Sequence, residues 1–255
     1  MFSVNVDKLT GMTESEHHSY SDTVDAIIKE CDKNYRIIAT HGEPLMAFKL
    51  ASVIHEKGKK VIFVDADVSE EIFLAKYKLG KNLKGFTDYF QEDEAIHDLV
   101  CKTNRKNLDI IFTGETQEFD KADILDSEFS DFRDCLVEQY DYVIVHTGDN
   151  YDIAAKCDAS VILLKQSDYS EMSAESKVDF LDSNGCFVLG LVVKNNGYWR
   201  HVMENNVEEF VKWIRNSDNI VFFGGAGVSK KAEYLILEAW MDYIIRNMHI
   251  HRKLF

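Results

Sequence analysis

The strongest constraint on the fold is an alternation between short apolar runs and amphipathic stretches along most of the chain. The runs are rich in β-branched residues and apolar throughout, as strands are when both faces of a sheet are covered. We expect strands at residues 36–40, 60–66, 108–114, 142–147, 160–166 and 186–194. We expect helices between them at residues 45–57, 69–79, 127–139 and 169–181. This order predicts an α/β fold with a mostly parallel sheet flanked by helices.

Composition and charge exclude several classes of protein. The chain has 255 residues, of which 45% are apolar, so it can bury a large core. Its net charge of −15 argues against nucleic-acid binding and against a polybasic membrane surface. No apolar run approaches the ~20 residues that span a bilayer, and no secretory signal is visible. The five cysteines form no CxxC pair, so we interpret them as reduced thiols of a cytoplasmic protein.

The junction after the first predicted strand has some features of a phosphate-binding loop. Such a loop needs consecutive backbone N–H groups, glycines that let them approach the ligand, and a lysine. Here the strand at residues 36–40 leads into Gly42, Glu43, Pro44 and Leu45, and no lysine stands at the start of the helix. These four residues are the candidate cofactor-binding residues of a degenerate phosphate loop, in which Pro44 lacks an N–H donor.

A second set of candidates ends the next predicted strand. Asp65 and Asp67 form a DxD pattern directly after the apolar run. Carboxylate oxygens are suitable ligands for Mg²⁺. Asp65 and Asp67 are therefore a weak candidate metal site, and the alternative is a pair of solvated carboxylates that bind nothing. No residue is assigned a catalytic role.

Taken in order, these motifs resemble the MinD/ParA-like P-loop group, and within it the bacterial tyrosine kinases (BY-kinases) of capsule and exopolysaccharide synthesis. The similarity covers about residues 20–196. The segments that carry it are the DxD strand, GFTDYF (85–90), NLDIIFTG (107–114), ILDS (124–127), YDYVIV (140–145) and LGLVVKN (189–195). The resemblance implies a P-loop NTPase architecture, with ATP and Mg²⁺ as cofactors if the loop is competent.

The chain also departs from the pattern of that family. Where the family reads GEGKS or GEGKT, Gly42 and Glu43 are followed at once by Pro44, as if a Gly-Lys pair had been deleted. The position of the family's Walker B aspartate is occupied by His146. An imidazole does not replace a carboxylate that orients hydrated Mg²⁺. Losing a lysine ~4 Å from a phosphate removes roughly 1 to 4 kcal/mol of attraction, depending on the local dielectric.

These departures favour a pseudokinase without a bound cofactor. We expect a non-catalytic partner or regulator in capsule or exopolysaccharide biosynthesis, which docks on a membrane polysaccharide co-polymerase that acts as activator. It would be cytoplasmic, or peripheral at the inner membrane through that partner, without nucleic-acid binding or membrane insertion. One alternative is a weakly active ATP-dependent protein tyrosine kinase or ATPase that uses Asp65 and Asp67.

A different resemblance appears near the C-terminus. Residues 203–229 resemble the first residues of bacterial sirtuins, the NAD-dependent protein deacylases. In that family Gly225, Ala226, Gly227 and Ser229 would line the NAD pocket. The sirtuin pattern does not continue in frame. In a shifted frame the codons of residues 240–243 must encode Asp-Gly-Leu, as the sirtuin pattern requires, which indicates a frameshift.

The C-terminal segment is therefore interpreted as a vestigial sirtuin start fused behind a kinase-like gene. The alternative is a genuine terminal strand and helix. In either case we expect no deacylase activity, because the histidine base and the acyl-lysine channel are missing from the pattern. The predicted organisation is an N-terminal appendage (1–34), a degenerate P-loop kinase-like domain (35–200) and a sirtuin-like fragment with its tail (201–255).

Overall fold

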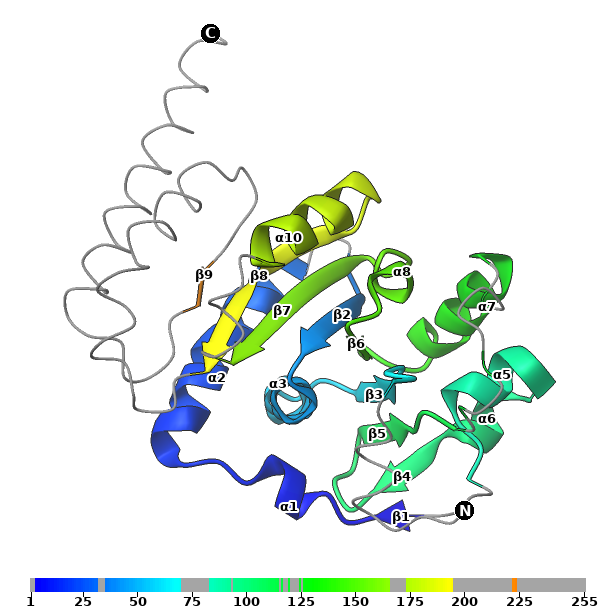
Figure 1. The fold of residues 1–255 in the computed structure, drawn as a ribbon. Helices are drawn as coiled ribbons and strands as arrows, with labels where there is room; N and C mark the ends of the chain where they lie inside the picture. Colours follow the sequence, from blue (N-terminus) through cyan, green and yellow to red (C-terminus); the bar gives the residue numbers. More distant parts are fainter. Residues whose placement is uncertain are drawn as a thin grey trace, which may run out of the picture.

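A single mixed sheet forms the centre of the molecule, and helices cover both of its faces (Figure 1). The computed structural model describes residues 3–31, 35–69, 83–92, 94–114, 116, 119, 124, 126–165, 173–194 and 222–223. The strands within these residues follow the order β1-β4-β5-β3-β6-β2-β7-β8-β9. All neighbouring pairs are parallel except β4 and β5. The predicted α/β fold with a mostly parallel sheet is confirmed.

The six predicted strands are all present in the described residues. They are β2 (Ile37–Gly42), β3 (Val61–Asp65), β5 (Leu108–Ile111), β6 (Tyr142–Gly148), β7 (Ala159–Lys165) and β8 (Phe187–Lys194). Three further short strands lie at the sides of the sheet: β1 (Ser3–Val4), β4 (Cys101–Thr103) and β9 (Phe222–Phe223). β1 and β4 are too short to carry a recognisable apolar run, whereas β9 lies in the apolar run at residues 220–223.

Two apolar cores lie on opposite faces of the sheet. One packs α1 (Asp7–Thr10), α2 (Glu14–Cys31) and α3 (Pro44–Glu56) against the strands. The other contains residues of α5 (Phe86–Glu92), α6 (Ile96–Leu99), α7 (Asp126–Val137), α8 (Tyr151–Ala154) and α10 (Ser173–Ser183). Alternate residues of each central strand enter the two cores, which is why these strands are apolar throughout.

The N-terminal segment packs into the first of these cores. Val4, Val6, Leu9, Val24 and Ile27 are buried there. In the sequence, α2 shows only a short helical pattern near residues 24–29, because charged residues interrupt its apolar stripe. The expected domain boundaries at residues 34 and 200 stay predictions, since residues 32–34 and 195–200 lie outside the described residues.

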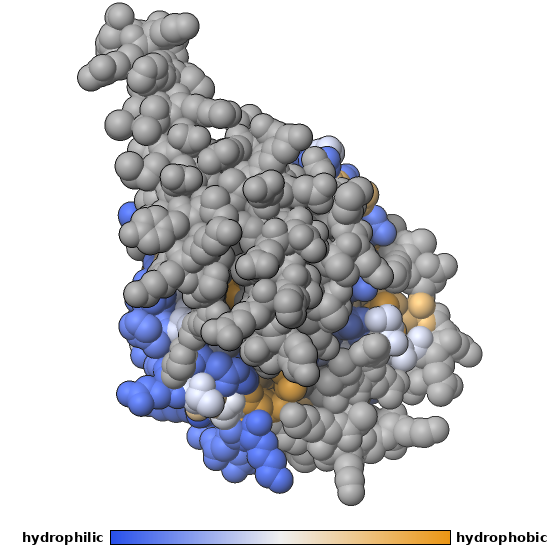
Figure 2. Space-filling model, turned by 60° about the vertical axis from the view of Figure 1, so that its left-hand side comes forward, coloured by the Kyte–Doolittle hydropathy of each residue, from blue (hydrophilic) through white to orange (hydrophobic). Residues whose placement is uncertain are grey.

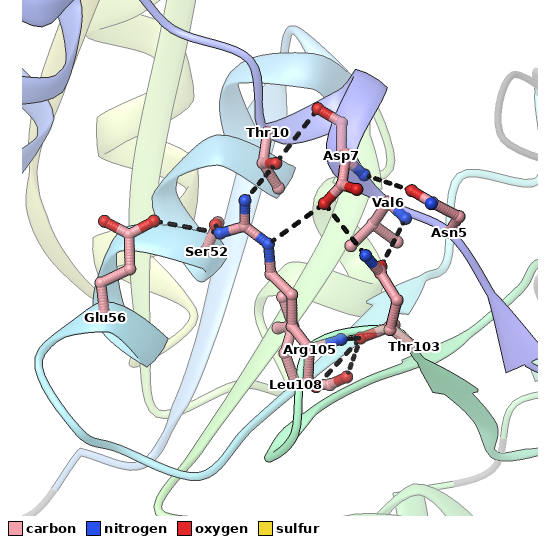
Figure 3. A network of polar contacts seen from close by, with 10 residues as sticks. Asn5, Val6, Asp7, Thr10, Ser52, Glu56, Thr103, Arg105 and Leu108 are labelled. Carbon is pink, nitrogen blue, oxygen red and sulfur yellow. Dashed lines mark hydrogen bonds and ion pairs between the residues drawn. The ribbon is translucent and has the colours of Figure 1, made fainter.

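A polar network centred on Arg105 joins this segment to the sheet and to α3 (Figure 3). The guanidinium donates to Thr10 Oγ1 at 2.8 Å, Ser52 Oγ at 3.2 Å and Glu56 Oε1 at 3.1 Å. Its Nε lies 3.9 Å from Oδ1 of Asp7. One side chain from the β4–β5 turn therefore connects α1 with α3.

The face drawn in Figure 2 is mostly hydrophilic where residues are described, with orange apolar residues visible in small areas only. Among the large apolar residues of the described chain, only Phe180 is strongly exposed. No helix in the part of the chain that the structure describes is long and apolar enough to cross a bilayer. The predicted helix at 69–79 falls almost entirely outside the described residues.

Candidate functional site

The carboxyl ends of β3, β6 and β2 meet at one edge of the sheet, where open α/β sheets bind ligands. Asp65 on β3 is the register partner of His146 on β6, and His146 is also the register partner of Thr40 on β2. The sheet thus brings together the predicted metal residue Asp65 and the histidine found at the Walker B position. Asp67 lies two residues beyond the end of β3 and is buried.

The predicted phosphate loop is reduced to a single residue between a strand and a helix. Gly42 is the last residue of β2, while Pro44 and Leu45 are the first two residues of α3. Glu43 alone separates the two elements, and its backbone N–H donates to the carbonyl oxygen of Leu163 on β7 at 3.4 Å. The strand therefore continues beside β7 up to the point where the helix begins.

Gly42 has no substitute at this junction. Its φ of +88° is in the left-handed region, and a Cβ there would lie 1.9 Å from the carbonyl oxygen of Leu163. The β2 ladder also shifts register against β6 between Thr40 and His41. Glycine lets β2 stay close to β7 through this irregularity.

Two buried histidines at the ends of β2 and β6 are each paired with a threonine of the other strand. His146 Nδ1 lies 3.4 Å from Thr40 Oγ1, and His41 Nδ1 lies 3.0 Å from Thr147 Oγ1. The ring of His41 also stacks on Tyr151 at a centroid distance of 4.7 Å. Sequence reasoning missed Thr40, Thr147 and Tyr151, although Thr40 and Thr147 end the predicted strands at residues 36–40 and 142–147, which could have pointed to this edge.

Burial favours the neutral forms of Asp65 and His146, which are register partners on β3 and β6. Desolvation raises the pKa of Asp65 to about 8, and the nearby charge of Asp67 acts in the same direction. Desolvation also lowers the pKa of His146 to about 4. This effect of burial is larger than the opposing effect of the Asp67 charge, which raises the pKa. At neutral pH the Asp65 carboxyl is mostly protonated and the His146 imidazole is uncharged.

Asp67 is held by its own loop. Its Oδ1 accepts hydrogen bonds from the backbone N–H of Ser69 at 3.0 Å and from the Ser69 hydroxyl at 2.5 Å. Its Oδ2 lies against Gly148, where a Cβ would come within 2.3 Å. His146 Nε2 is 4.0 Å from the same oxygen. One Asp65 oxygen, Oδ2, and His146 Nε2 are buried without a hydrogen-bond partner.

The predicted metal site consequently has two carboxylates with different environments. No group of three or more His, Cys, Asp or Glu side chains with the geometry of a metal site occurs within the described ranges. Asp65 and Asp67 stay a prediction as metal ligands. The NAD-loop candidates Gly225, Ala226, Gly227 and Ser229 lie outside the described residues.

Comparison with known proteins identifies relatives of this chain. No protein-family model matches it. The tyrosine-protein kinase CpsD of Streptococcus agalactiae is 22% identical over 158 residues, which cover 60% of this chain and 69% of that protein. CpsD of Streptococcus pneumoniae serotype 4 is 22% identical over 192 residues, which cover 65% of this chain and 85% of that protein. The putative tyrosine-protein kinase EpsB of Ralstonia nicotianae is 32% identical over 107 residues, which cover 42% of this chain and 14% of that protein.

Solved structures agree with these relatives on the fold. The chimerical protein CapA2B2 aligns with a TM-score of 0.64 at 17% identity, covering 75% of this chain and 92% of its own. The kinase domain of Escherichia coli tyrosine kinase ETK aligns with a TM-score of 0.56 at 17% identity, covering 68% and 72%. MinD of Pyrococcus horikoshii, solved with Mg-ADP, aligns with a TM-score of 0.51 at 18% identity, covering 66% and 72%. The chain is therefore homologous to the CpsD and EpsB tyrosine kinases and has the fold of BY-kinase domains and MinD/ParA-like P-loop proteins.

Proposed function

We propose that this chain is a BY-kinase-like P-loop protein that acts in capsule or exopolysaccharide biosynthesis without transferring phosphoryl groups. The observation that carries the proposal is the junction between β2 and α3, where Glu43 alone separates strand from helix. A phosphate loop wraps several consecutive N–H groups around the anion before its helix begins. One residue is too short for that wrap.

The donors at this junction also do not fit a triphosphate. The N–H of Glu43 is directed to Leu163, and Pro44 has no N–H. The Glu43 carboxylate would bring a negative charge towards the phosphates. The lysine that neutralises β- and γ-phosphates is missing from the start of α3, so the helix N-terminus alone would have to hold the anion.

The metal side of the site supports the same conclusion. Mg²⁺ prefers oxygen ligands and retains several waters, which an imidazole does not orient as a carboxylate does. His146 is fully buried, and Asp65 is protonated over most of the neutral range. A neutral Asp65 and an imidazole are both poor ligands for Mg²⁺.

A non-catalytic role is compatible with a chain that shares the fold of kinase domains. The relatives are named tyrosine-protein kinases, and one of them lies in the cps region of Klebsiella pneumoniae, with 27% identity over 121 residues. We infer that this chain binds a membrane polysaccharide co-polymerase as a regulatory partner, at the inner face of the membrane. It would do so through its fold and surface rather than through nucleotide turnover.

Calorimetric titration of the full chain with ATP and Mg²⁺ tests this proposal. We expect no binding in the wild type. A variant with Gly-Lys inserted between Glu43 and Pro44 and with His146→Asp should gain affinity for ATP–Mg²⁺, because it restores both the cation and the Mg²⁺-orienting carboxylate. Circular dichroism would show whether the inserted variant is folded.

The competing enzyme hypothesis makes the opposite prediction. If wild-type protein binds ATP–Mg²⁺ and the Asp65→Ala substitution abolishes that binding, the chain is a nucleotide-binding protein and our proposal is wrong. Transfer of labelled γ-phosphate to tyrosine in the wild type, lost in the same variant, would establish a weakly active kinase instead.

A further inference from the structure

The outermost strand beside β8 comes from the segment whose sequence resembles a sirtuin start. Phe222 and Phe223 form β9, which pairs in parallel with β8 through the register partners Leu191–Phe222 and Val192–Phe223. Figure 1 shows β9 in orange beside β8 in yellow. The frameshift indicated by the sequence lies beyond residue 229, so β9 belongs to the part that is read in frame. A segment interpreted as vestigial therefore contributes a strand to the kinase-like sheet.

The connection between β8 and β9 has the length that a parallel pair requires. Parallel neighbours cannot be joined by a tight hairpin and need a crossover of a dozen or more residues. β8 ends at Lys194 and β9 begins at Phe222, so the 27 residues numbered 195–221 connect them. The preceding pair, β7 and β8, is also parallel and is joined by a connection that contains α10. β9 thus continues the parallel order of β7 and β8.

The outer side of β8 would be open to other chains if nothing paired with it. The strand is eight residues long, and its sequence FVLGLVVK has a single charge, at the last position, and no proline. Its inner side pairs with β7 over seven residues, and Val188, Leu189 and Val192 are buried. A long apolar strand with an open edge is a template on which another chain can add a strand.

Both sides of the sheet end in a strand of two residues within the part of the chain that the structure describes. β1 lies outside β4 at one side, and β9 lies outside β8 at the other. Very short edge strands are one way in which proteins prevent pairing between sheets, because they offer few free N–H and C=O groups. With β9 on Leu191 and Val192, a strand of another chain cannot pair with β8 along its full length.

We propose that the sirtuin-like segment serves this chain as an edge guard, whose strand β9 occupies the outer side of β8 and prevents another chain from pairing there. Pairing between backbones requires little of the sequence beyond β propensity, which phenylalanine has, so a strand of unrelated origin can take this role. The role needs neither an NAD pocket nor a histidine base. The segment is then part of the kinase-like fold, and the predicted boundary at residue 200 falls inside one folding unit.

Hydrogen exchange of the β8 amides tests the edge guard in the full chain. Phe222→Pro/Phe223→Pro removes both N–H groups of β9 and so breaks its pairing with β8. Phe222→Ala/Phe223→Ala is the matched control, because it removes the same two rings and keeps the N–H groups. We expect exchange at residues 191–193 to accelerate at least about tenfold in the proline variant and less than about threefold in the alanine variant. Exchange in β2 should stay unchanged in both.

The two single proline variants provide an internal control, which also serves if the double variant does not fold. Successive residues of a strand direct their N–H groups to opposite sides, so only one residue of β9 donates towards β8. One of Phe222→Pro and Phe223→Pro should therefore accelerate exchange in β8, and the other should leave it near the wild-type rate. Equal acceleration by both would contradict the assigned pairing.

A peptide probe distinguishes protection of the edge from general stabilisation. A labelled peptide with the sequence of residues 219–225 should bind the proline variant, whose β8 edge is open, and should not bind the wild type, as fluorescence anisotropy would measure. Unchanged exchange in β8 of the proline variant would show that β9 does not cover this edge, and the proposal would be wrong. Faster exchange in β2 as well would also contradict it, since the segment would then stabilise the whole sheet.

Discussion

The Nε2 atom of His146 lies 4.0 Å from Oδ2 of Asp67, and both side chains are buried at the carboxyl edge of the sheet. This distance would suit an ion pair, yet burial lowers the pKa of His146 to about 4. The imidazole in this contact is therefore uncharged at physiological pH. Since Asp65 is also mostly protonated there, this edge carries less charge than its residue types suggest.

The raised pKa of Asp65 predicts that folding stability falls as pH rises. The folded chain retains a proton on Asp65 up to about pH 8, while the unfolded chain loses it near pH 4. Between these values the folded state binds more protons, so stability falls by up to about 1.4 kcal/mol per pH unit. Asp65→Asn should remove this slope, which urea unfolding from pH 6.5 to 8.5 would measure. A parallel decline in the variant would contradict the assigned cause.

The lowered pKa of His146 predicts the opposite slope at lower pH. Between about pH 4 and about pH 6.5 the unfolded chain binds the extra proton, so stability rises with pH. In the wild type this rise offsets the decline caused by Asp65. His146→Gln should expose the decline from about pH 4 upward, as urea unfolding at each pH would reveal. An unchanged profile below pH 6.5 would show that His146 is protonated in the folded chain.

Alanine substitutions at two glycines separate steric clash from backbone strain. Gly42 and Gly58 both have positive φ, +88° and +82°, but a Cβ at Gly58 meets no atom within 4 Å. Gly58→Ala should cost about 1 kcal/mol, the price of strain alone. Gly42→Ala should cost at least about 3 kcal/mol, because the methyl would overlap the Leu163 carbonyl. If chemical denaturation showed the same loss of unfolding free energy for both variants, β2 could move away from β7 at no cost in stability.

The forked contacts of Arg105 predict that lysine cannot replace it. Arg105→Lys keeps the charge but cannot reach Thr10 and Glu56 at the same time. We expect a loss of roughly 1 to 2 kcal/mol in the free energy of unfolding, since the fork is partly exposed. Lys8→Met, an exposed substitution on α1, serves as the control and should change stability by less than about 0.5 kcal/mol. Proteolysis at the N-terminal segment should accelerate only in the Arg105 variant.

The central strands could be predicted because consecutive residues, such as Ile62 and Phe63, enter cores on opposite faces of the sheet, which makes the runs apolar throughout. Asp65 and Asp67 could be located as candidates because they end such a run. Their partners could not be found in this way. The pairing of Thr40 with His146 depends on β6 lying between β2 and β3, and strand order is not encoded in local pattern.

The junction at Gly42 shows a second limit of local pattern. Gly42 stands at a predicted junction between strand and helix, where a phosphate-binding loop would lie, so the sequence predicted a degenerate loop there. In the structure Gly42 extends the strand, and Pro44 takes the first position of α3, where its missing N–H costs nothing. Whether such residues form a loop depends on the distance between β2 and β7, which only the assembled sheet determines.

Cys135 lies in a cavity bordered by α5, α6 and α7, which we call the acidic cavity because Glu94, Glu128 and Asp131 also line it. The reactivity of its thiol should depend on the electrostatic potential in that cavity. Cys135 is exposed and lines the cavity with Glu128 and Asp131, while the other four cysteines are buried. Native protein should therefore react at one thiol per chain with a neutral maleimide, and Cys135→Ser should react at none. An anionic aromatic disulfide should react more slowly at low salt and faster as salt screens the carboxylates. If Glu128→Lys/Asp131→Lys leaves that salt dependence unchanged, the carboxylates do not set the potential in the cavity.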